Sequence, residues 1–355
     1  MPRVSEEILF SISFNLLKSS GASNEEARVV SEHCIDANLA GHDSHGIIQI
    51  PTYLERIKMG HIVPGAPFEI IKSSETTTVI DGNWGFGYLV SKRAMEITIE
   101  KAKTHNVAAT TVFRQSHVGR VASYPTMASR AGMIGLMTAD SGRSAKTVAP
   151  FGGTEARLGT NPICFAMPSD LDGPLFVDMA TSAAAAGKLN LAAARGHEVP
   201  EGWILDNDGI PSTDPSSLKE GGVLLPLGGN EGHKGYGLSV IIEIFSGILT
   251  GLGFGHEPSG RHNDGCFMAV FNVEAFLPLK QFKSQVTEFA EYLKSSSPRE
   301  GVDEVLYPGE IESKNIVKNK ANGIYIEDST WIQLQSISKN LDLVDSLDWS
   351  TISNS

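Results

Sequence analysis

Cysteine, long apolar runs and positive charge are all scarce in this 355-residue sequence. The three cysteines, Cys34, Cys164 and Cys266, lie far apart and form no C-x-x-C pair. That spacing excludes a disulfide framework and a zinc ribbon, and it favours a reducing, cytoplasmic compartment. The most apolar stretch, 238–254, is interrupted by Glu243 and by glycines, so we expect no membrane span.

Basic residues are the minority charge: 29 Lys and Arg stand against 41 Asp and Glu, for a net charge of −12. A surface of that sign repels a phosphate backbone, so nucleic acid is not an expected partner. An anionic substrate would need a local cationic pocket. At the N-terminus, Glu6 and Glu7 lie where a signal peptide requires an apolar run.

The composition that remains, 41% hydrophobic and 20% charged, is ordinary for a globular protein with a large core. Capping residues predict two helices in the first 40 residues, one after Ser5 and one opened by the capping box Ser23-x-x-Glu26. Asp81-Gly82-Asn83 predicts a turn. Apolar periodicity predicts further helices at 52–59, 90–103, 121–131, 234–250 (buried and nearly free of charge) and 280–295, and strands at 66–80, 107–113, 133–138, 163–167, 175–179 and 266–273.

This mixture is typical of an α+β or mixed α/β fold rather than a regular βαβ array. No linker separates independent domains, so we expect one domain of interleaved lobes over 1–345. The helical lobe comprises about 1–65 and 300–345, and a cofactor and substrate lobe comprises about 66–299. Residues 346–355 form a tail, which we expect to be poorly ordered after Trp349.

Sequence motifs for binding a nucleotide are missing. A Rossmann fingerprint needs G-x-G-x-x-G between a strand and a helix, so that backbone N–H groups hold the pyrophosphate. Gly85-Phe86-Gly87 lacks the third glycine, and the glycines of 251–255 follow a helix instead of preceding one. There is also no G-x-x-x-x-G-K-[ST] phosphate loop, so spacing alone demonstrates no nucleotide cofactor.

The densest polar cluster is His42-Asp43-Ser44-His45. A histidine beside a hydroxyl or carboxylate suits proton transfer near neutral pH. The same histidines also fit a metal site, with His117 or Asp140 as a third ligand. A surface turn with satisfied polar groups is a third interpretation, and the residues alone leave all three open.

A second group of polar residues, Ser116-His117-Val118-Gly119-Arg120, follows a predicted buried strand. Ligand-facing side chains gather at such strand ends, and Arg120 is suited to bind a carboxylate through two hydrogen bonds. A helix-capping histidine and a solvated arginine explain the segment equally well. Weaker signals are the turn 159–162, the small residues after the strand in 176–182, the helix start 233–237 and the turn 308–310.

Together these segments resemble one family, the type-2 malate/L-lactate dehydrogenases, over about residues 5–345. The motifs that carry the resemblance occur in the family's order: GHDSHG (41–46), His117, APFGG (149–153), LGTNP (158–162), DMATS (178–182), HKGYGL (233–238) and YPGE (307–310). The stretch ANLAGHDSHGI and the pair HVGR and HKGY look closest to the hydroxycarboxylate dehydrogenase B branch.

The resemblance implies a homodimer with a non-Rossmann, largely antiparallel sheet lobe for NAD, with NADP also possible. It implies that His45 and His117 are catalytic, and that Ser44, Gln49, Tyr53 and Arg120 meet the substrate. No resident metal is implied. The implied cofactor residues are His45, Gly119, Arg120, Val121, Ser141, Phe176, Val177, Asp178, Met179, Ala180, His233, Lys234, Pro308, Gly309 and Glu310.

The chain departs from the family at Gln49, where many members have an arginine that clamps the substrate carboxylate. A neutral amide supplies no charge, and our hypothesis is that Arg120 replaces it. The basic segment 142–146 is a further candidate for contact with a phosphate or the substrate. The expected activity is hydride transfer between NAD(P) and a small 2-hydroxy or 2-oxo acid. The alternative from another class is a metal-dependent lyase or hydrolase that uses His42, His45 and His117.

Overall fold

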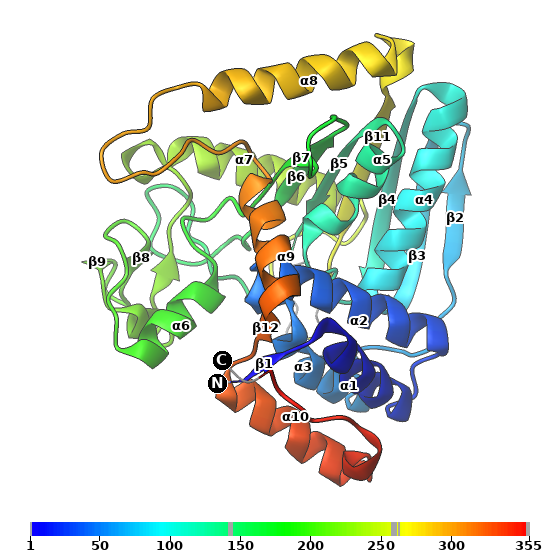
Figure 1. The fold of residues 1–355 in the computed structure, drawn as a ribbon. Helices are drawn as coiled ribbons and strands as arrows, with labels where there is room; N and C mark the ends of the chain where they lie inside the picture. Colours follow the sequence, from blue (N-terminus) through cyan, green and yellow to red (C-terminus); the bar gives the residue numbers. More distant parts are fainter. Residues whose placement is uncertain (1, 141–144, 257–260, 262, 353–355) are drawn as a thin grey trace.

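A seven-stranded sheet organises the computed structural model, which describes residues 2–140, 145–256, 261 and 263–352 (Figure 1). Neighbouring strands are antiparallel except for β3 and β4, which run parallel and are joined by helix α4 (Gly87–His105). The sheet is therefore largely antiparallel, and the prediction of a mixed α/β fold is confirmed. In spatial order the strands are β2 (Glu69–Ser73), β3 (Thr77–Gly85), β4 (Val107–Gln115), β11 (Cys266–Asn272), β5 (Met133–Ala139), β6 (Ile163–Met167) and β7 (Leu175–Met179).

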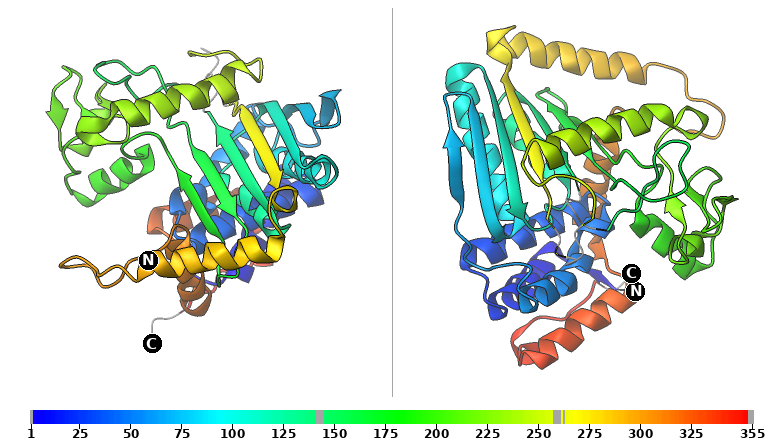
Figure 2. Two further views of the ribbon diagram at one scale, coloured as in Figure 1. Left: turned by 90° about the horizontal axis from the view of Figure 1, so that it is seen from above. Right: turned by 180° about the vertical axis from the view of Figure 1, so that it is seen from behind.

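Helices cover both faces of this sheet (Figure 2). On one face lie α4 and α5 (Pro125–Arg130), and on the other lies α7 (His233–Glu243), continued by a π-helical turn, Ile244–Ile248. Strand β5 shows how alternation makes this possible: Met137 is in the buried cluster under α4 and α5, whereas the next hydroxyl, Thr138 Oγ1, lies 2.8 Å from Ser246 Oγ. The central strands are therefore covered on both sides, whereas all residues of the edge strand β2 are exposed.

A helical layer formed by both ends of the chain closes the bottom of the molecule in Figure 1. Both predicted caps are confirmed: Ser5 caps α1, and Ser23 and Glu26 form the capping box of α2. Strands β1 and β12 pair antiparallel within this layer. Its elements are β1 (Arg3–Val4), α1 (Glu6–Ser19), α2 (Asn24–Leu39), α3 (Ile50–Lys58), α9 (Glu310–Asn322), β12 (Ile324–Tyr325) and α10 (Asp328–Asn340).

The C-terminal segment packs on the rest of the protein over more residues than the sequence predicted. Leu347 belongs to the buried cluster of the helical layer, and Trp349 packs edge-on against Trp331 with ring centroids 5.2 Å apart. The Ile352 amide donates to the Arg3 carbonyl at 2.7 Å. The predicted tail, 346–355, is thus packed on the N-terminal strand as far as residue 352.

Three local predictions need correction. Asp81-Gly82-Asn83 is no turn but part of β3, whose pairing with β4 shifts register between Asp81 and Gly85 because Asn83 and Trp84 have positive φ. The helix expected at 121–131 is a 3-10 turn (Val121–Ser123) followed by the short α5, which begins at Pro125. The segment between β7 and α7 contains an unpredicted helix, α6 (Ala186–Arg195), with a small sheet of β8 (Ile204–Leu205), β9 (Pro211–Ser212) and β10 (Val223–Leu224).

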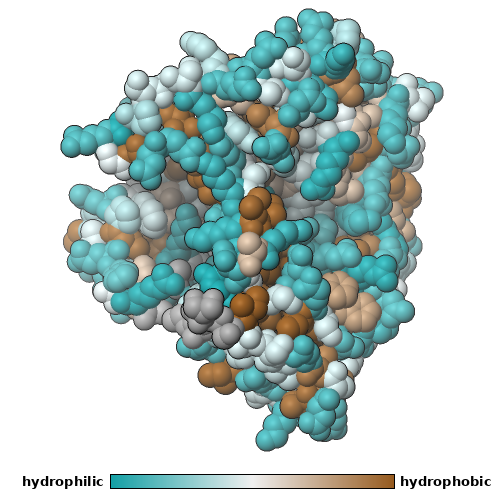
Figure 3. Space-filling view, in the orientation of Figure 1, coloured by the Kyte–Doolittle hydropathy of each residue, from teal (hydrophilic) through white to brown (hydrophobic). Residues whose placement is uncertain are grey.

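Helix α7 and its π-helical extension were expected to be buried, and that prediction is wrong for one face. Ser239 and Ile242 are buried against the sheet, but Ile241, Ile244 and Ile248 are 43–50% exposed. Helix α8 (Leu279–Lys294) is also amphipathic, with Ala290 buried and Phe289 exposed. Among the described helices, none is both long and apolar enough to cross a bilayer. The face drawn in Figure 3 is mostly hydrophilic, with small groups of apolar residues between.

Candidate active site

The polar cluster after α2 is held by a buried asparagine that the sequence analysis did not single out. Asn38 donates from Nδ2 to Asp43 Oδ1 at 2.7 Å, and its Oδ1 accepts from the Ile47 amide at 2.8 Å. A Cβ on Gly46 would lie 2.1 Å from the same Oδ1, so only glycine allows this approach. The 3-10 turn Asp43–His45 is therefore fixed at both ends, and His45 has a defined direction.

His42 points away from His45 and toward α9. Its Nε2 lies 3.2 Å from Glu312 Oε1, and this hydrogen bond, partly opposed by burial, lowers the pKa of Glu312. Among the described residues, no three His, Cys, Asp or Glu side chains are grouped so that they could hold a metal ion. His42, His45 and His117 thus do not form the metal triad of the alternative prediction.

His45 and His117 lie side by side although 72 residues separate them. Their rings stack with centroids 5.7 Å apart and an interplanar angle of 21°. His117 follows the end of β4, and the Gly87 amide at the start of α4 donates to the Ser116 hydroxyl at 3.1 Å. A strand end and a clamped turn thus bring two imidazoles to one place, where either is chemically able to exchange a proton with a bound molecule.

A chain of buried hydroxyls runs behind His117. Tyr53 Oη lies 2.7 Å from His117 Nδ1 and 2.9 Å from Tyr88 Oη, which in turn accepts from Cys34 Sγ at 3.8 Å. Burial raises the pKa of both tyrosines well above 10, so both phenols keep their protons at neutral pH. If each hydroxyl donates toward the histidine, His117 Nδ1 is an acceptor and its proton sits on Nε2.

The half-buried position of His45 controls its charge. Burial lowers its pKa to about 4, and the positive charges of His42 and Arg120 act in the same direction. The Ser44 hydroxyl lies 3.1 Å from its Nδ1. His45 is therefore neutral at pH 7 and ready to accept a proton.

The loop between His117 and Val121 is held by groups that sequence reasoning missed. The buried Asp264, on the chain entering β11, accepts from the Val118 amide at 2.9 Å, and Tyr124 Oη donates to the Val118 carbonyl at 2.6 Å. Gly119 has φ +70°, and a Cβ there would lie 2.2 Å from the Tyr88 ring. No signal in a single sequence reveals these contacts, because the partners are distant along the chain.

The same loop reaches a second set of predicted residues on β7. Arg120 lies over the Phe176 ring, 5.1 Å from its centroid, and its buried Nε has no hydrogen-bond partner among the described residues. Asp178 Oδ2 accepts from the Ala122 amide at 2.7 Å. Predicted cofactor residues of 119–121 and 176–180 therefore adjoin one another, with Val177 exposed and Met179 half-buried. Ser141 and the segment 142–144 lie outside the described residues.

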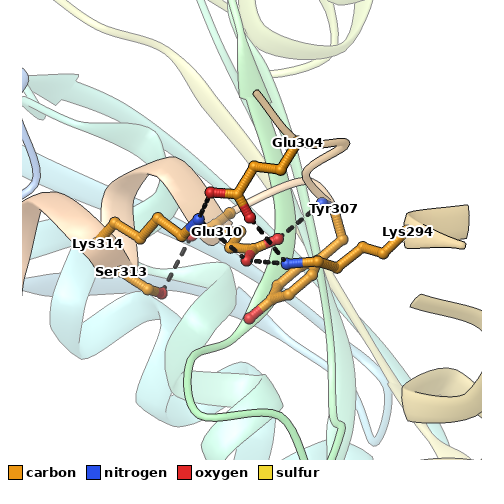
Figure 4. Close-up of polar contacts among 7 residues, drawn as sticks. Lys294, Glu304, Tyr307, Glu310, Ser313 and Lys314 are labelled. Atoms are coloured by element: carbon orange, nitrogen blue, oxygen red, sulfur yellow. Dashed lines mark hydrogen bonds and ion pairs between the residues drawn. The ribbon is translucent and has the colours of Figure 1, made fainter. Parts of the chain in front are cut away.

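The turn Pro308–Glu310 packs against this strand. The Phe176 amide donates to the Pro308 carbonyl at 3.2 Å, and Gly309, with φ +94°, leaves no room for a Cβ beside the Phe176 ring. An ion-pair network fixes the turn (Figure 4): the Glu310 carboxylate contacts Lys294, Lys314 and the Tyr307 amide. Burial would raise the pKa of Glu310, but these partners lower it overall.

His233 and Lys234 are not brought to the histidine pair by any contact. Both side chains are exposed at the start of α7, where His233 meets Phe151 edge-on and Lys234 lies 3.0 Å from Glu231. The backbone connects this region to the 178–182 motif, since the Leu227 amide donates to the Thr181 carbonyl at 2.9 Å. In the basic segment, Lys146 Nζ forms an ion pair with Glu243 Oε1 at 3.2 Å, and both side chains are buried.

Of the predicted substrate residues, Ser44 and Tyr53 contact the histidine pair and Gln49 holds the turn beside it, while Arg120 lies over Phe176. Gln49 uses its amide to donate to the Ser44 carbonyl at 2.7 Å, which stabilises the turn and leaves the amide oxygen for other partners. Tyr53 contacts His117 directly. A nicotinamide cofactor fits these residues chemically, because the buried Arg120 Nε has a hydrogen bond to donate and no partner among the described residues.

The fold and the histidine pair define a class, and comparison with known proteins agrees with it. The sequence pattern of the malate/L-lactate dehydrogenase family matches residues 4–335, so the chain belongs to that family. The chain is 37% identical to the L-sulfolactate dehydrogenase of Methanothermobacter thermautotrophicus, over 96% of this chain and 98% of that protein.

Two further relatives agree. Hydroxycarboxylate dehydrogenase B of Escherichia coli is 33% identical, over 93% of this chain and 91% of that protein. The crystal structure of malate dehydrogenase from Entamoeba histolytica superposes with a TM-score of 0.91 at 32% identity, covering 96% of this chain and 98% of that one. The family resemblance drawn from the motifs is confirmed over almost the whole chain.

Proposed function

We propose that this protein transfers a hydride between NAD(P) and C2 of a small 2-hydroxy or 2-oxo acid. The observation that carries the proposal is the stacking of His45 on His117, 5.7 Å between centroids, in a chain of this family. The cofactor supplies the hydride acceptor or donor. The protein must then move the hydroxyl proton, since loss of hydride alone would leave a protonated carbonyl.

His45 is the proposed proton acceptor. Its low pKa keeps it neutral in the free enzyme, and the negative charge of a bound carboxylate would stabilise the imidazolium formed on oxidation. His117, held by Tyr53, orients the substrate oxygen. Ser44, Gln49, Tyr53 and Arg120 are proposed to bind the substrate, and the residues of 119–121, 141, 176–180, 233–234 and 308–310 the cofactor.

We propose a non-Rossmann mode of cofactor binding. The largely antiparallel sheet supports it, since a doubly wound dinucleotide fold needs parallel strands. Separate buried clusters support the two-lobe division: one draws on residues 4–89 and 324–347, the other on 80–270. The three buried cysteines, which form no disulfide, support a cytoplasmic location.

We also propose a homodimer that covers the exposed apolar face of α7. Ile241, Ile244 and Ile248 share this face. Ile244 and Ile248 line a hollow of about 340 Å³ together with Phe254, which is 72% exposed. An apolar patch of this kind is typical of a subunit interface. The variant Ile244→Lys/Ile248→Lys should elute as a monomer, whereas Ile332→Lys, at an isoleucine 63% exposed on α10, should not change the elution.

A spectrophotometric screen tests the activity. NAD and NADP are each combined with 2-hydroxy acids, and the reduced forms with aromatic and dicarboxylic 2-oxo acids and cyclic imines. We expect turnover with at least one pair, and its loss in His45→Asn. No cofactor-linked turnover with any of them, or activity that EDTA removes and a divalent ion restores, would contradict the proposal.

A further inference from the structure

A cationic pocket lies on the side of Arg120 that faces the helical layer. It has a volume of about 270 Å³ and is formed between α2, α4, α5 and α9. Four of its lining side chains are basic, Lys92, Arg120, Arg130 and Lys320, and one is acidic, Asp36. The remaining lining residues are His33, Leu39, Ser123, Thr126, Met127 and Ile316. A local surplus of positive charge stands out in a chain with a net charge of −12.

The basic side chains of this pocket act electrostatically on the same two groups, His33 and Asp36. Burial lowers the pKa of His33 to about 4, and Lys92, Arg120 and Arg130 all add to that effect. The charges of Arg130, Arg120 and Lys320 all act on Asp36. Since Coulomb interactions weaken steeply with distance, cations from four elements surround one small space.

Much of this positive charge has no partner. Lys92 lies 2.6 Å from Glu96, and Lys320 lies 3.8 Å from Glu6. Neither Arg120 nor Arg130 forms an ion pair with any other described residue. Buried nitrogens of two lining residues, Arg120 Nε and His33 Nδ1, also lack a hydrogen-bond partner among the described residues. Arg120 Nε is a donor in every state, and His33 Nδ1 is a donor in the tautomer that carries its proton there. An unpaired buried donor is costly, so a ligand with acceptor oxygens would stabilise this arrangement.

We propose that this pocket binds a phosphoryl group. A phosphoryl group presents three acceptor oxygens and nearly two negative charges, which suit two guanidinium groups and two ammonium groups better than a single carboxylate does. The Ser123 hydroxyl offers a further donor, whereas the Thr126 hydroxyl already donates to the Ala122 carbonyl at 2.7 Å. The volume holds several water-sized groups. Among the lining residues Asp36 reduces the formal charge from four to three, and Glu96 and Glu6 outside the lining pair with Lys92 and Lys320. The two arginines are therefore the cations left for a ligand.

Two sources of a phosphoryl group fit the position. One is free inorganic phosphate. The other is the ribose phosphate of NADP, because Arg120 also lies over Phe176, which packs against the Gly309 turn. The second source rests on the proposed function, whereas the first does not.

Calorimetric titration of the full-length protein with inorganic phosphate at low salt is the first experiment. The test variant is Arg130→Gln/Lys320→Gln, and the matched control is Arg28→Gln on the exposed side of α2. We expect the wild type and the control to bind alike and the test variant to bind about tenfold more weakly or worse. Tm values within a few degrees of the wild type, measured without phosphate, establish that the test variant is folded.

The second experiment repeats the titration with NADP and with NAD. Weaker binding of NADP but not of NAD by the test variant assigns the pocket to the cofactor's ribose phosphate. Weaker binding of inorganic phosphate alone assigns it to a free anion. Equal affinities of the test variant and the control for phosphate and for NADP, or no binding of either ligand by the wild type, overturn the proposal. Binding needs no turnover, so its failure is distinct from that of the dehydrogenase activity.

Discussion

The phenolic oxygen of Tyr53 lies 2.7 Å from Nδ1 of His117, and both groups are cut off from water on the side of Tyr88. A buried phenol with a raised pKa keeps its proton, so Tyr53 can donate to Nδ1 of His117 or accept from it. His117 therefore depends on a residue of α3, from the helical layer, for the orientation of its ring.

Tyr53→Phe removes that hydroxyl and keeps the packing of the ring. We expect kcat to fall by about ten- to a hundredfold with little change in KM, because the histidine loses its orientation and not its contact with the substrate. Steady-state kinetics measure this. Tyr88→Phe, which removes the next hydroxyl in the chain, should lower kcat much less. Equal losses in the two variants would contradict a direct role for Tyr53.

Gly119→Ala tests the close approach of the His117 loop to Tyr88. The new Cβ would lie 2.2 Å from the Tyr88 ring and add strain at φ +70°, so we expect a loss of about 2–4 kcal/mol in unfolding free energy. Gly152→Ala is the matched control, with φ +82° and nothing within 4 Å, and should cost only about 1 kcal/mol. Urea denaturation distinguishes the two. Similar losses would show that the contact with Tyr88 relaxes without cost.

The lowered pKa of His33 makes stability depend on pH in a defined window. The unfolded chain binds a proton at His33 below pH 6.5, but the folded protein does so only near pH 4. The unfolded state therefore binds more protons between these values, and unfolding free energy falls as the pH drops through them. Between pH 7 and 4.5 the unfolding free energy of His33→Gln should therefore fall by about 2 kcal/mol less than that of the wild type.

The comparison between variant and wild type is essential here. Burial raises the pKa values of Asp36 and Asp178, which stabilises the folded protein at low pH and opposes the histidine effect. The urea midpoint of unfolding is measured against pH for both proteins, and the difference between the two curves gives the contribution of His33. Parallel curves would mean that His33 keeps an ordinary pKa when folded.

The pH dependence of oxidation tests the proposed role of His45. A neutral imidazole must accept the substrate proton, and the pKa of about 4 places its protonation well below the usual 6.5. We expect kcat/KM for oxidation to stay level down to about pH 5 and to decline only below it. A decline centred near pH 6.5 would assign proton transfer to a histidine with an ordinary pKa.

Arg120→Ala tests the hypothesis that this cation replaces the arginine missing at position 49. If Arg120 binds the substrate carboxylate, KM for the acid rises by about a hundredfold, and adding Gln49→Arg recovers part of the loss. Arg120→Lys should recover less, since an ammonium group cannot form two parallel hydrogen bonds. If only the KM of the cofactor rises, Arg120 binds the cofactor and not the substrate carboxylate.

Much of the fold was predictable because its signals are local. The caps at Ser5 and Ser23 and the apolar alternation of β6 and β7 depend on neighbours a few residues away, and their bounds agree with the structure. The ordered motifs likewise identified the family. Predictions were wrong where a distant partner decides: 81–83 continues strand β3 beside β4 instead of turning, and one face of α7 remains exposed.

The sequence by itself determined the family and predicted which residues carry the chemistry: two histidines, a basic loop and a set of small-residue turns. Only the tertiary structure decided that His45 stacks on His117 while His42 turns to Glu312, and that Tyr53, Asn38 and Asp264 hold this arrangement. The physical reason is that hydrogen bonds and desolvation depend on distance in space, and chain packing brings together groups that sequence spacing does not relate.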